Sequence, residues 1–199
     1  MSAVHQNTSE HHHRQIDLRF YHREDGLYEV EGRLVDRKTV AFRRQLSEVD
    51  SPPGDTLHDI TVTLVFDAAM WVHDARAYMR ATPFDICPGA EGTLTPLIGL
   101  QMAGGWNKSV RTLLKGARSC THIVELLGPL ATTAYQGLAP LRLAQINQPE
   151  NEAQRRAKVD SCFAYAAERS VVARLWPELH RSAPGPGGDT GLPSPIARE

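Results

Sequence analysis

The sequence has few cysteines and no long apolar run. Its three cysteines, Cys87, Cys120 and Cys162, are scattered along 199 residues and do not suggest a disulfide framework. No stretch approaches the roughly 18–20 consecutive apolar residues that a membrane helix needs. The N-terminal region also lacks the apolar core of a signal peptide. We therefore predict a cytoplasmic protein without a membrane partner, in a compartment that keeps its thiols reduced.

An excess of charge of either sign is also missing. The formal net charge is −1, from 22 basic and 23 acidic residues, so no basic field favours nucleic acid as a partner. The sequence contains no glycine-rich phosphate loop and no Gly-x-Ser-x-Gly nucleophile motif. Its 41% hydrophobic and 23% charged residues are ordinary for a globular protein. We expect one domain over residues 14–180, between disordered tails at 1–13 and 181–199.

Histidine, by contrast, is plentiful, with nine copies. Three of them form the run His11, His12 and His13. The run is not at the terminus and leads directly into a segment with a strand pattern. This position favours a native segment over the remnant of a purification tag.

Alternating apolar and polar residues predict an antiparallel sheet. Residues 15–21 and 27–36 alternate on either side of a Glu-Asp-Gly turn signal, which predicts a hairpin. Residues 60–66 alternate and are rich in β-branched side chains, and residues 71–79 can pair back against them. The first half of the chain is therefore expected to form the sheet.

Helical spacing dominates the second half. Three helices are predicted, at residues 96–102, 107–114 and 120 to about 145. Gly128 and Pro129 should bend or split the longest of them. Residues 159–176 fit a terminal hairpin, while a helix across 152–175 competes with it. The predicted fold is α+β, with helices of the C-terminal half packed on an antiparallel sheet built from the N-terminal hairpin and the central strands.

The segment Cys120-Thr121-His122 is the strongest candidate for chemistry. It lies at the predicted start of the long helix, where free amide groups and the positive end of the helix dipole favour a thiolate. Arg118 precedes it, and Glu125 follows His122 by three residues. The alternative is a buried cysteine with a histidine that only caps the helix.

Two further residues at element ends complete a candidate metal site. His58 precedes the strand at 60–66, and Cys87 lies in a loop bounded by prolines. Neutral imidazole and thiolate are ligands that suit zinc or iron. Long spacing between these residues distinguishes the pattern from a compact zinc finger. A surface or core histidine and a buried cysteine are the structural alternatives.

Several runs resemble a bacterial family of uncharacterised proteins, domain of unknown function 2889, over residues 14 to 180. They are His58-Asp-Ile-Thr-Val-Thr-Leu-Val-Phe66, Thr82-Pro-Phe-x-x-Cys87, Gly104-Gly105-Trp106 and Cys120-Thr121-His122-x-x-Glu125. Ser119 stands where the family pattern has glycine. This resemblance implies no biochemical activity.

The predicted order of elements is also similar to iron–sulfur scaffolds of the NifU/IscU type. That resemblance implies a core in which Cys87 and Cys120 match the second and third cluster cysteines. His58 or Asp59 would stand near the position of the first, which this chain lacks. A harder Cys/His site is therefore expected rather than a cluster held by three thiolates.

The leading functional prediction is a metal-dependent enzyme, such as a hydrolase or decarboxylase acting on a small organic substrate. His58, Cys87 and Cys120 would hold zinc or iron, and His122 would be a fourth ligand or a general acid/base assisted by Glu125. Asp59, Asp85 and Cys162 are expected in supporting positions. The alternatives are a metal or iron–sulfur carrier, and an enzyme with Cys120 as nucleophile. For the latter, His122 is expected to lie awkwardly close in sequence for a direct hydrogen bond, so that His58 or His73 would serve as base. A homo-oligomer is left open.

Overall fold

The computed structural model describes residues 8–182, and the chain divides into two compact units that meet between Ala139 and Pro140. We expected a single domain over residues 14–180. The described residues form two separate hydrophobic clusters, each within one of the two units. The outer parts of the predicted tails, 1–7 and 183–199, lie outside the described residues. The inner end of the N-terminal tail is ordered, because His13 begins the first strand.

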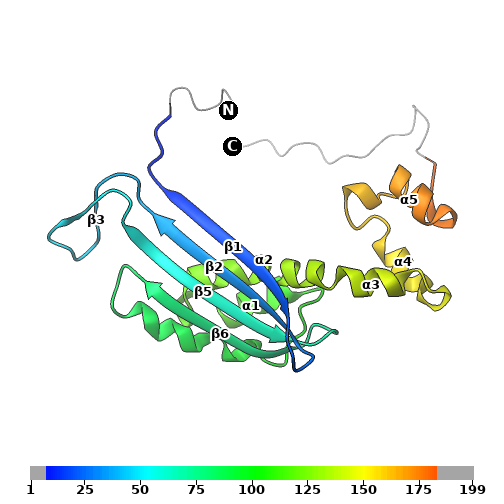
Figure 1. The fold of residues 1–199 in the computed structure, drawn as a ribbon, viewed down its shortest axis with the longest axis horizontal. Helices are drawn as coiled ribbons and strands as arrows, with labels where there is room; N and C mark the ends of the chain where they lie inside the picture. The colour runs from blue at the N-terminus through cyan, green and yellow to red at the C-terminus, as the bar shows by residue number, and fades with distance from the viewer. Residues whose placement is uncertain (1–7, 183–199) are drawn as a thin grey trace. The chain divides into compact units, whose positions relative to one another are not determined.

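The first unit is a four-stranded antiparallel sheet, in the order β1-β2-β5-β6, with helices against one face (Figure 1). Strands β3 and β4 form a separate two-stranded ribbon. The strands are β1 (His13–His22), β2 (Tyr28–Arg37), β3 (Phe42–Arg43), β4 (Asp50–Ser51), β5 (Thr56–Phe66) and β6 (Val72–Ala81). The helices are the 3-10 helix η2 (Cys87–Leu97), α1 (Trp106–Leu113), the 3-10 helix η3 (Gly116–Arg118) and α2 (Thr121–Gly137). The predicted α+β class and the origin of its sheet and helices are confirmed.

The core lies between the sheet and α2. Alternate residues of each strand point to the helices, as a pleated strand requires. The residues of β2 and β5 that face the helices are buried, and α2 adds one apolar stripe to the same hydrophobic cluster. Gly32 of β2 allows close approach, because a Cβ there would stand 3.0 Å from a methyl group of Leu130. The buried stripe of α2 is made by Ile123, Leu126, Leu127, Leu130 and Ala134.

Gly128 and Pro129 do not split the long helix. Helix α2 continues through Pro129 and ends at Gly137, with the next helix beginning at Ala139. Proline removes one helical hydrogen bond, but burial of the leucines on both sides of it holds the helix on the sheet. Trp106 of α1 also donates from Nε1 to the Leu127 carbonyl at 2.9 Å, which ties the two helices together.

The helix predicted at 96–102 is also wrong. The helical segment there is η2, which ends at Leu97, and the residues after it form a turn that pairs with the start of β6. Gly99 donates its amide to the Val72 carbonyl at 2.8 Å, and Val72 donates to Leu100 at 2.9 Å. Pairing with the start of β6 satisfies these backbone groups more completely than a short helix would.

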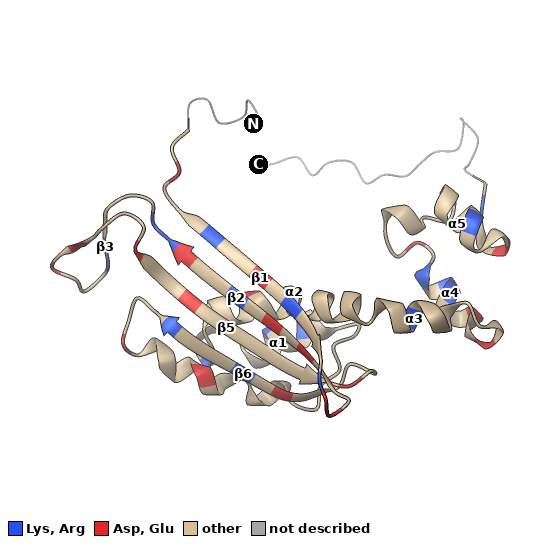
Figure 2. Ribbon diagram, viewed as in Figure 1, with Lys and Arg blue, Asp and Glu red and all other residues tan. Residues whose placement is uncertain are grey.

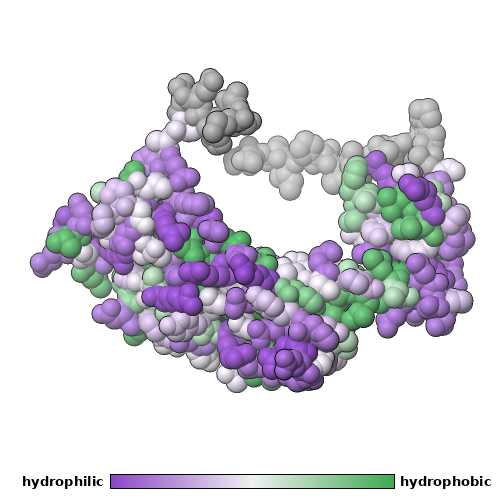
Figure 3. Space-filling view, viewed as in Figure 1, coloured by the Kyte–Doolittle hydropathy of each residue, from purple (hydrophilic) through white to green (hydrophobic). Residues whose placement is uncertain are grey.

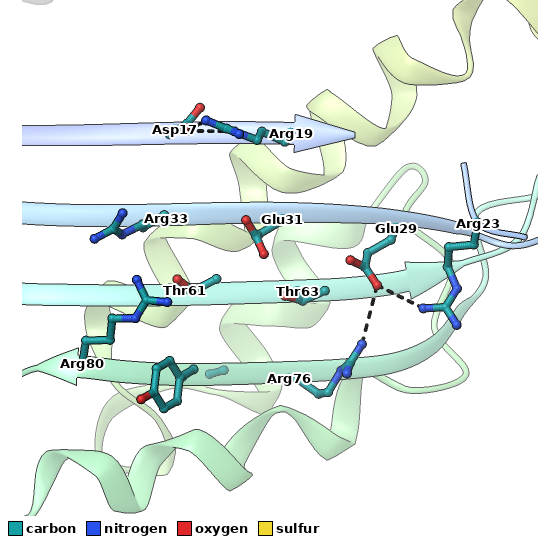
Figure 4. Close-up of a pocket in the computed structure, with 12 residues that line it drawn as sticks. Asp17, Arg19, Arg23, Glu29, Glu31, Arg33, Thr61, Thr63, Arg76 and Arg80 are labelled. Carbon is teal, nitrogen blue, oxygen red and sulfur yellow. Dashed lines mark hydrogen bonds and ion pairs between the residues drawn. The ribbon is translucent and has the colours of Figure 1, made fainter. Parts of the chain in front are cut away.

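The outer face of the sheet carries charge of both signs. Figure 2 shows acidic and basic residues along the strands, and Figure 3 shows hydrophilic residues gathered over them. A shallow hollow of about 770 Å³ lies on this face. Its side chains pair with one another, as with Glu29, whose carboxylate lies 3.1 Å from Arg23 and 3.6 Å from Arg76 (Figure 4). These charges are largely satisfied, as expected of a solvated sheet face.

The second unit consists of short helices around a small cluster formed by Val172, Trp176 and Leu179. Its helices are α3 (Ala139–Ile146), η4 (Pro149–Asn151), α4 (Glu152–Lys158), η5 (Phe163–Tyr165), α5 (Ser170–Leu175) and η6 (Pro177–Leu179). The predicted hairpin at 159–176 is wrong, because this segment is helical in two pieces separated by a turn. No helix among residues 8–182 is long and apolar enough to cross a membrane.

Candidate functional site

A row of polar side chains ends the apolar face of the sheet. Arg14, Asp36 and His58 are direct cross-strand neighbours on β1, β2 and β5. The next row along the same face is apolar, with Leu34 paired to Ile60. The three polar residues are in phase with the core, so the pleat directs them toward the helices and away from the charged outer face.

Asp36 is the centre of this row and is 1% exposed. Both of its oxygens accept hydrogen bonds from the Arg14 guanidinium, at 2.8 Å each, and His12 Nε2 lies 3.2 Å from Oδ1. Burial raises the pKa of Asp36, but the hydrogen bonds and charge of Arg14, then the contact with His58, outweigh it and lower the pKa to about 2. Asp36 is therefore an ionised carboxylate at neutral pH.

Two histidine rings lie against each other beside this carboxylate. His58 Nδ1 lies 3.0 Å from Asp36 Oδ2, and the His58 and His122 rings are 3.9 Å apart between centroids with 37° between their planes. His122 Nε2 is 3.9 Å from Asp36 Oδ2. Burial, followed by the neighbouring His122, lowers the pKa of His58, although Asp36 opposes that change. His58 is accordingly neutral at pH 7.

Cys120 occupies the N-cap position of α2 and contacts His122 directly. Its backbone is extended and its carbonyl accepts the first helical hydrogen bond, from Val124 at 3.1 Å. The Cys120 Sγ lies 3.6 Å from His122 Nδ1, so the expected difficulty of a direct contact at this spacing is wrong. The extended cap residue turns its side chain over the first helical turn. Ser119 is also extended, a conformation that requires no glycine.

The environment of the Cys120 thiol favours its ionised form. Burial raises the pKa of this thiol, but His122 and the backbone N–H groups of Ile123 and His122 form hydrogen bonds that lower it overall. The Cys120 residue is only partly buried and lines a cavity. A helix start, a histidine and partial exposure together are the conditions of a reactive cysteine.

A cavity of about 520 Å³ opens beside the thiol. Its walls contain Cys120, Cys87, His58 and His122, and no lysine, arginine, aspartate or glutamate. The apolar part of the wall is formed by Ile60, Met79, Pro83, Phe84, Ile86 and Ala90. The volume is in the range of small-molecule sites, roughly 300–1,000 Å³.

The remaining predicted site residues lie elsewhere. Glu125 accepts a hydrogen bond from Arg14 Nη1 at 2.7 Å and is 46% exposed, so it supports Arg14 and does not line the cavity. Asp59 points to the outer face of the sheet, where it pairs with Arg33. Asp85 is exposed next to the cavity wall, and Cys162 is exposed in the second unit. The structure does not bring these four to the thiol.

One group of candidate metal ligands assembles within residues 8–182. Asp36, His58 and His122 offer ligand atoms that lie within 4.8 Å of one another, whereas neither Cys87 nor Cys120 joins such a group. The fit to an ion is poor. Arg14 holds both carboxylate oxygens of Asp36, and His58 Nδ1 already faces Asp36 Oδ2 at 3.0 Å. These contacts would have to change before one ion could be held.

Asp36, Arg14 and His12 are not among the site residues predicted from the sequence. A signal for the first two was present in the strand pattern. Asp36 alternates along β2 with the buried Val30 and Leu34, on the face opposite to the outward Glu29 and Glu31. A charged residue on the apolar face of a strand requires a partner for its charge. For His12, the position just before a strand carried no comparable signal.

Comparisons with known proteins locate the chain in a family. No curated protein and no solved structure gives a significant match. A family described as "Protein of unknown function (DUF2889)" matches residues 12–136, which is more than half of the chain. The matched range includes every residue of the polar row and both Cys120 and His122. The chain therefore belongs to the DUF2889 family.

Proposed function

We propose that this protein is a hydrolase that uses Cys120 as a nucleophile on the acyl group of a small organic substrate. The observation that carries the proposal is the 3.6 Å contact between Cys120 Sγ and His122 Nδ1 at the start of α2, beside a cavity of about 520 Å³. A thiol and a base in contact, with a third group near the base, form the general arrangement of covalent catalysis. We propose the cytoplasm as its location, because a reducing compartment keeps such a thiol free.

Each neighbouring group has a part in this chemistry. His122 holds the proton released by the thiol and returns it to the leaving group, while Asp36 supports the resulting imidazolium from 3.9 Å. Arg14 keeps Asp36 ionised and in place, and the His58 ring packs against the His122 ring and fixes it. Backbone N–H groups in the first turn of α2 are available to a developing oxyanion. Water then hydrolyses the acyl-thioester on Cys120, with His122 as its base.

A zinc or iron enzyme, the leading prediction from sequence, is the second candidate. The assembly of Asp36, His58 and His122 favours it, but the Arg14 guanidinium on both oxygens of Asp36 stands against it. An iron–sulfur carrier has weaker support, because only Cys87 and Cys120 of the three cysteines line the cavity. The thiol hydrolase uses the residues in the positions they already occupy.

Alkylation of the intact protein tests the nucleophile. With iodoacetamide at pH 7, we expect Cys120 to react several-fold faster than Cys162, although Cys162 is the more exposed thiol. Peptide mass spectrometry measures the two rates in one sample, so Cys162 serves as an internal reference. His122→Asn should slow Cys120 alone, whereas His73→Asn, a histidine paired with Asp67 away from the cavity, should change neither rate. A Cys120 rate below that of Cys162, or one unchanged by His122→Asn, would contradict the proposal.

A further inference from the structure

A cationic groove adjoins the thiol cavity. It encloses about 590 Å³ and is lined by Lys108, Arg111 and Lys115, with no acidic residue in its wall. None of these three cations forms an ion pair within the described residues. The chain has a net charge of −1, and most other arginines of this unit are paired with carboxylates. Three unpaired cations on one groove therefore create a local positive field.

The groove is built by the exposed side of α1 and the turn that follows it. Lys108 and Arg111 are three residues apart on α1, which places them on one face, and Lys115 lines the same groove from the turn after the helix. Trp106 and Val110, on the other side of the helix, are buried in the core and fix its orientation. The cations are therefore presented on a rigid support, a condition for recognising an anionic group.

The groove and the thiol cavity lie on two sides of one segment. Both are lined by Ser119 and Thr121, the two neighbours of Cys120. The Ser119 hydroxyl is further held by Thr93, at 2.7 Å between the two oxygens. A substrate whose reacting carbon lies at Cys120 would thus have an apolar cavity for one of its ends and three cations for the other.

We propose that the substrate is an acyl-coenzyme A thioester with an uncharged acyl group, a proposal that rests on the hydrolase function above. The acyl group would occupy the thiol cavity, whose walls carry no lysine, arginine, aspartate or glutamate. Coenzyme A would extend over the Ser119–Thr121 segment, with its phosphates on Lys108, Arg111 and Lys115. The pantetheine arm of coenzyme A connects its thioester end to its phosphates. The three phosphates complement the unpaired cations of the groove, whereas a neutral leaving group would not.

The reaction balances without any other reactant than water. The Cys120 thiolate attacks the carbonyl carbon, the carbon–sulfur bond to coenzyme A breaks, and coenzyme A leaves as a thiol with the proton held by His122. One thioester is thereby exchanged for another of similar energy. Water, deprotonated by His122, then attacks the acyl-Cys120 carbonyl and releases a carboxylic acid. Nothing is oxidised or reduced.

A matched pair of substrates tests the assignment with the full-length protein. Benzoyl-coenzyme A and benzoyl-N-acetylcysteamine carry the same acyl group, but only the first has phosphates, and release of free thiol measures kcat/KM for both. We expect the coenzyme A ester to be preferred by roughly tenfold or more. The variant K108Q/R111Q/K115Q should lose most of that preference, and added salt should reduce it in the wild type. The variant R19Q/R76Q/R80Q, which removes the same charge from the outer sheet face, should keep it.

Separate outcomes overturn the two levels of the proposal. Equal kcat/KM for both esters, a preference that survives K108Q/R111Q/K115Q, or no turnover of either ester would overturn the coenzyme A assignment. So would a strong preference for the same acyl group on an acyl carrier protein. Full activity of Cys120→Ala would instead overturn the nucleophile itself, as would failure to find benzoyl-Cys120 by mass spectrometry after rapid acid quenching of an active wild type.

Discussion

Replacing Asp36 by asparagine should destabilise the first unit by an amount that depends on pH. The fall of the Asp36 pKa from 3.8 to about 2 corresponds to about 2.5 kcal/mol of native-state stabilisation at neutral pH, at about 1.4 kcal/mol per pKa unit. Asparagine also leaves the Arg14 guanidinium with a neutral partner, although Glu125 still accepts from Nη1. We expect Asp36→Asn to lose about 2–3 kcal/mol of unfolding free energy at pH 7.

The pH dependence follows from the direction of the pKa change. A carboxyl whose pKa is lowered on folding stabilises the native state fully above its unfolded value, near 3.8, and loses that contribution as the pH falls through about 2. Urea unfolding at several pH values should therefore give a constant difference between wild type and Asp36→Asn down to about pH 4, and a shrinking difference below it. Because Asp36 raises the pKa of His58 against the effect of burial, the variant should also lower the pKa of His58 in an NMR titration.

Asp59→Asn is the matched control. Asp59 also forms a two-point pair with an arginine, at 2.8 and 2.7 Å from Arg33, but on the outer sheet face and without a histidine partner. It should cost stability without moving the His58 titration. A loss below about 1 kcal/mol for Asp36→Asn at pH 7, or a difference that stays constant down to pH 2.5, would refute the reasoning.

Two further predictions concern packing and metal. Gly137→Ala should lower the free energy of unfolding by about 1–3 kcal/mol, measured by thermal or urea unfolding, because the added Cβ would overlap the Phe20 ring. Gly104→Ala is the control: open space surrounds Gly104, so the change should be less than about 0.5 kcal/mol. Equal effects of the two variants would contradict the close packing of α2 on β1. In a competition titration with a chromophoric chelator, Arg14→Gln should bind zinc at least about tenfold more tightly than the wild type, because it removes a cation 2.8 Å from both oxygens of Asp36. Tight binding of one zinc ion by the wild type, lost in His58→Ala, would instead support the metal-dependent candidate.

Local patterns were sufficient for most elements of the first unit. The alternation in the four long strands and the apolar stripe of the long helix each depend on neighbours within a few residues, so the sheet, its source and the start of α2 at Cys120 could be predicted. The errors have a common origin. Pro129 did not end α2, and residues 98–102 did not form a helix, because contacts with the sheet outweighed local preference in both places.

By itself, the sequence determined the class of the fold, the position of Cys120 at a helix start and the nearness of His122, because each follows from spacing along the chain. Only the tertiary structure brought Arg14, Asp36 and His58 into one row, since strand register joins residues that are 22 positions apart. It also separated Asp59 and Glu125 from the thiol, through the pleat of β5 and the contact with Arg14. The cationic groove also depends on tertiary structure. It lies next to Cys120 because α1 packs on α2, and no local sequence pattern predicts that packing.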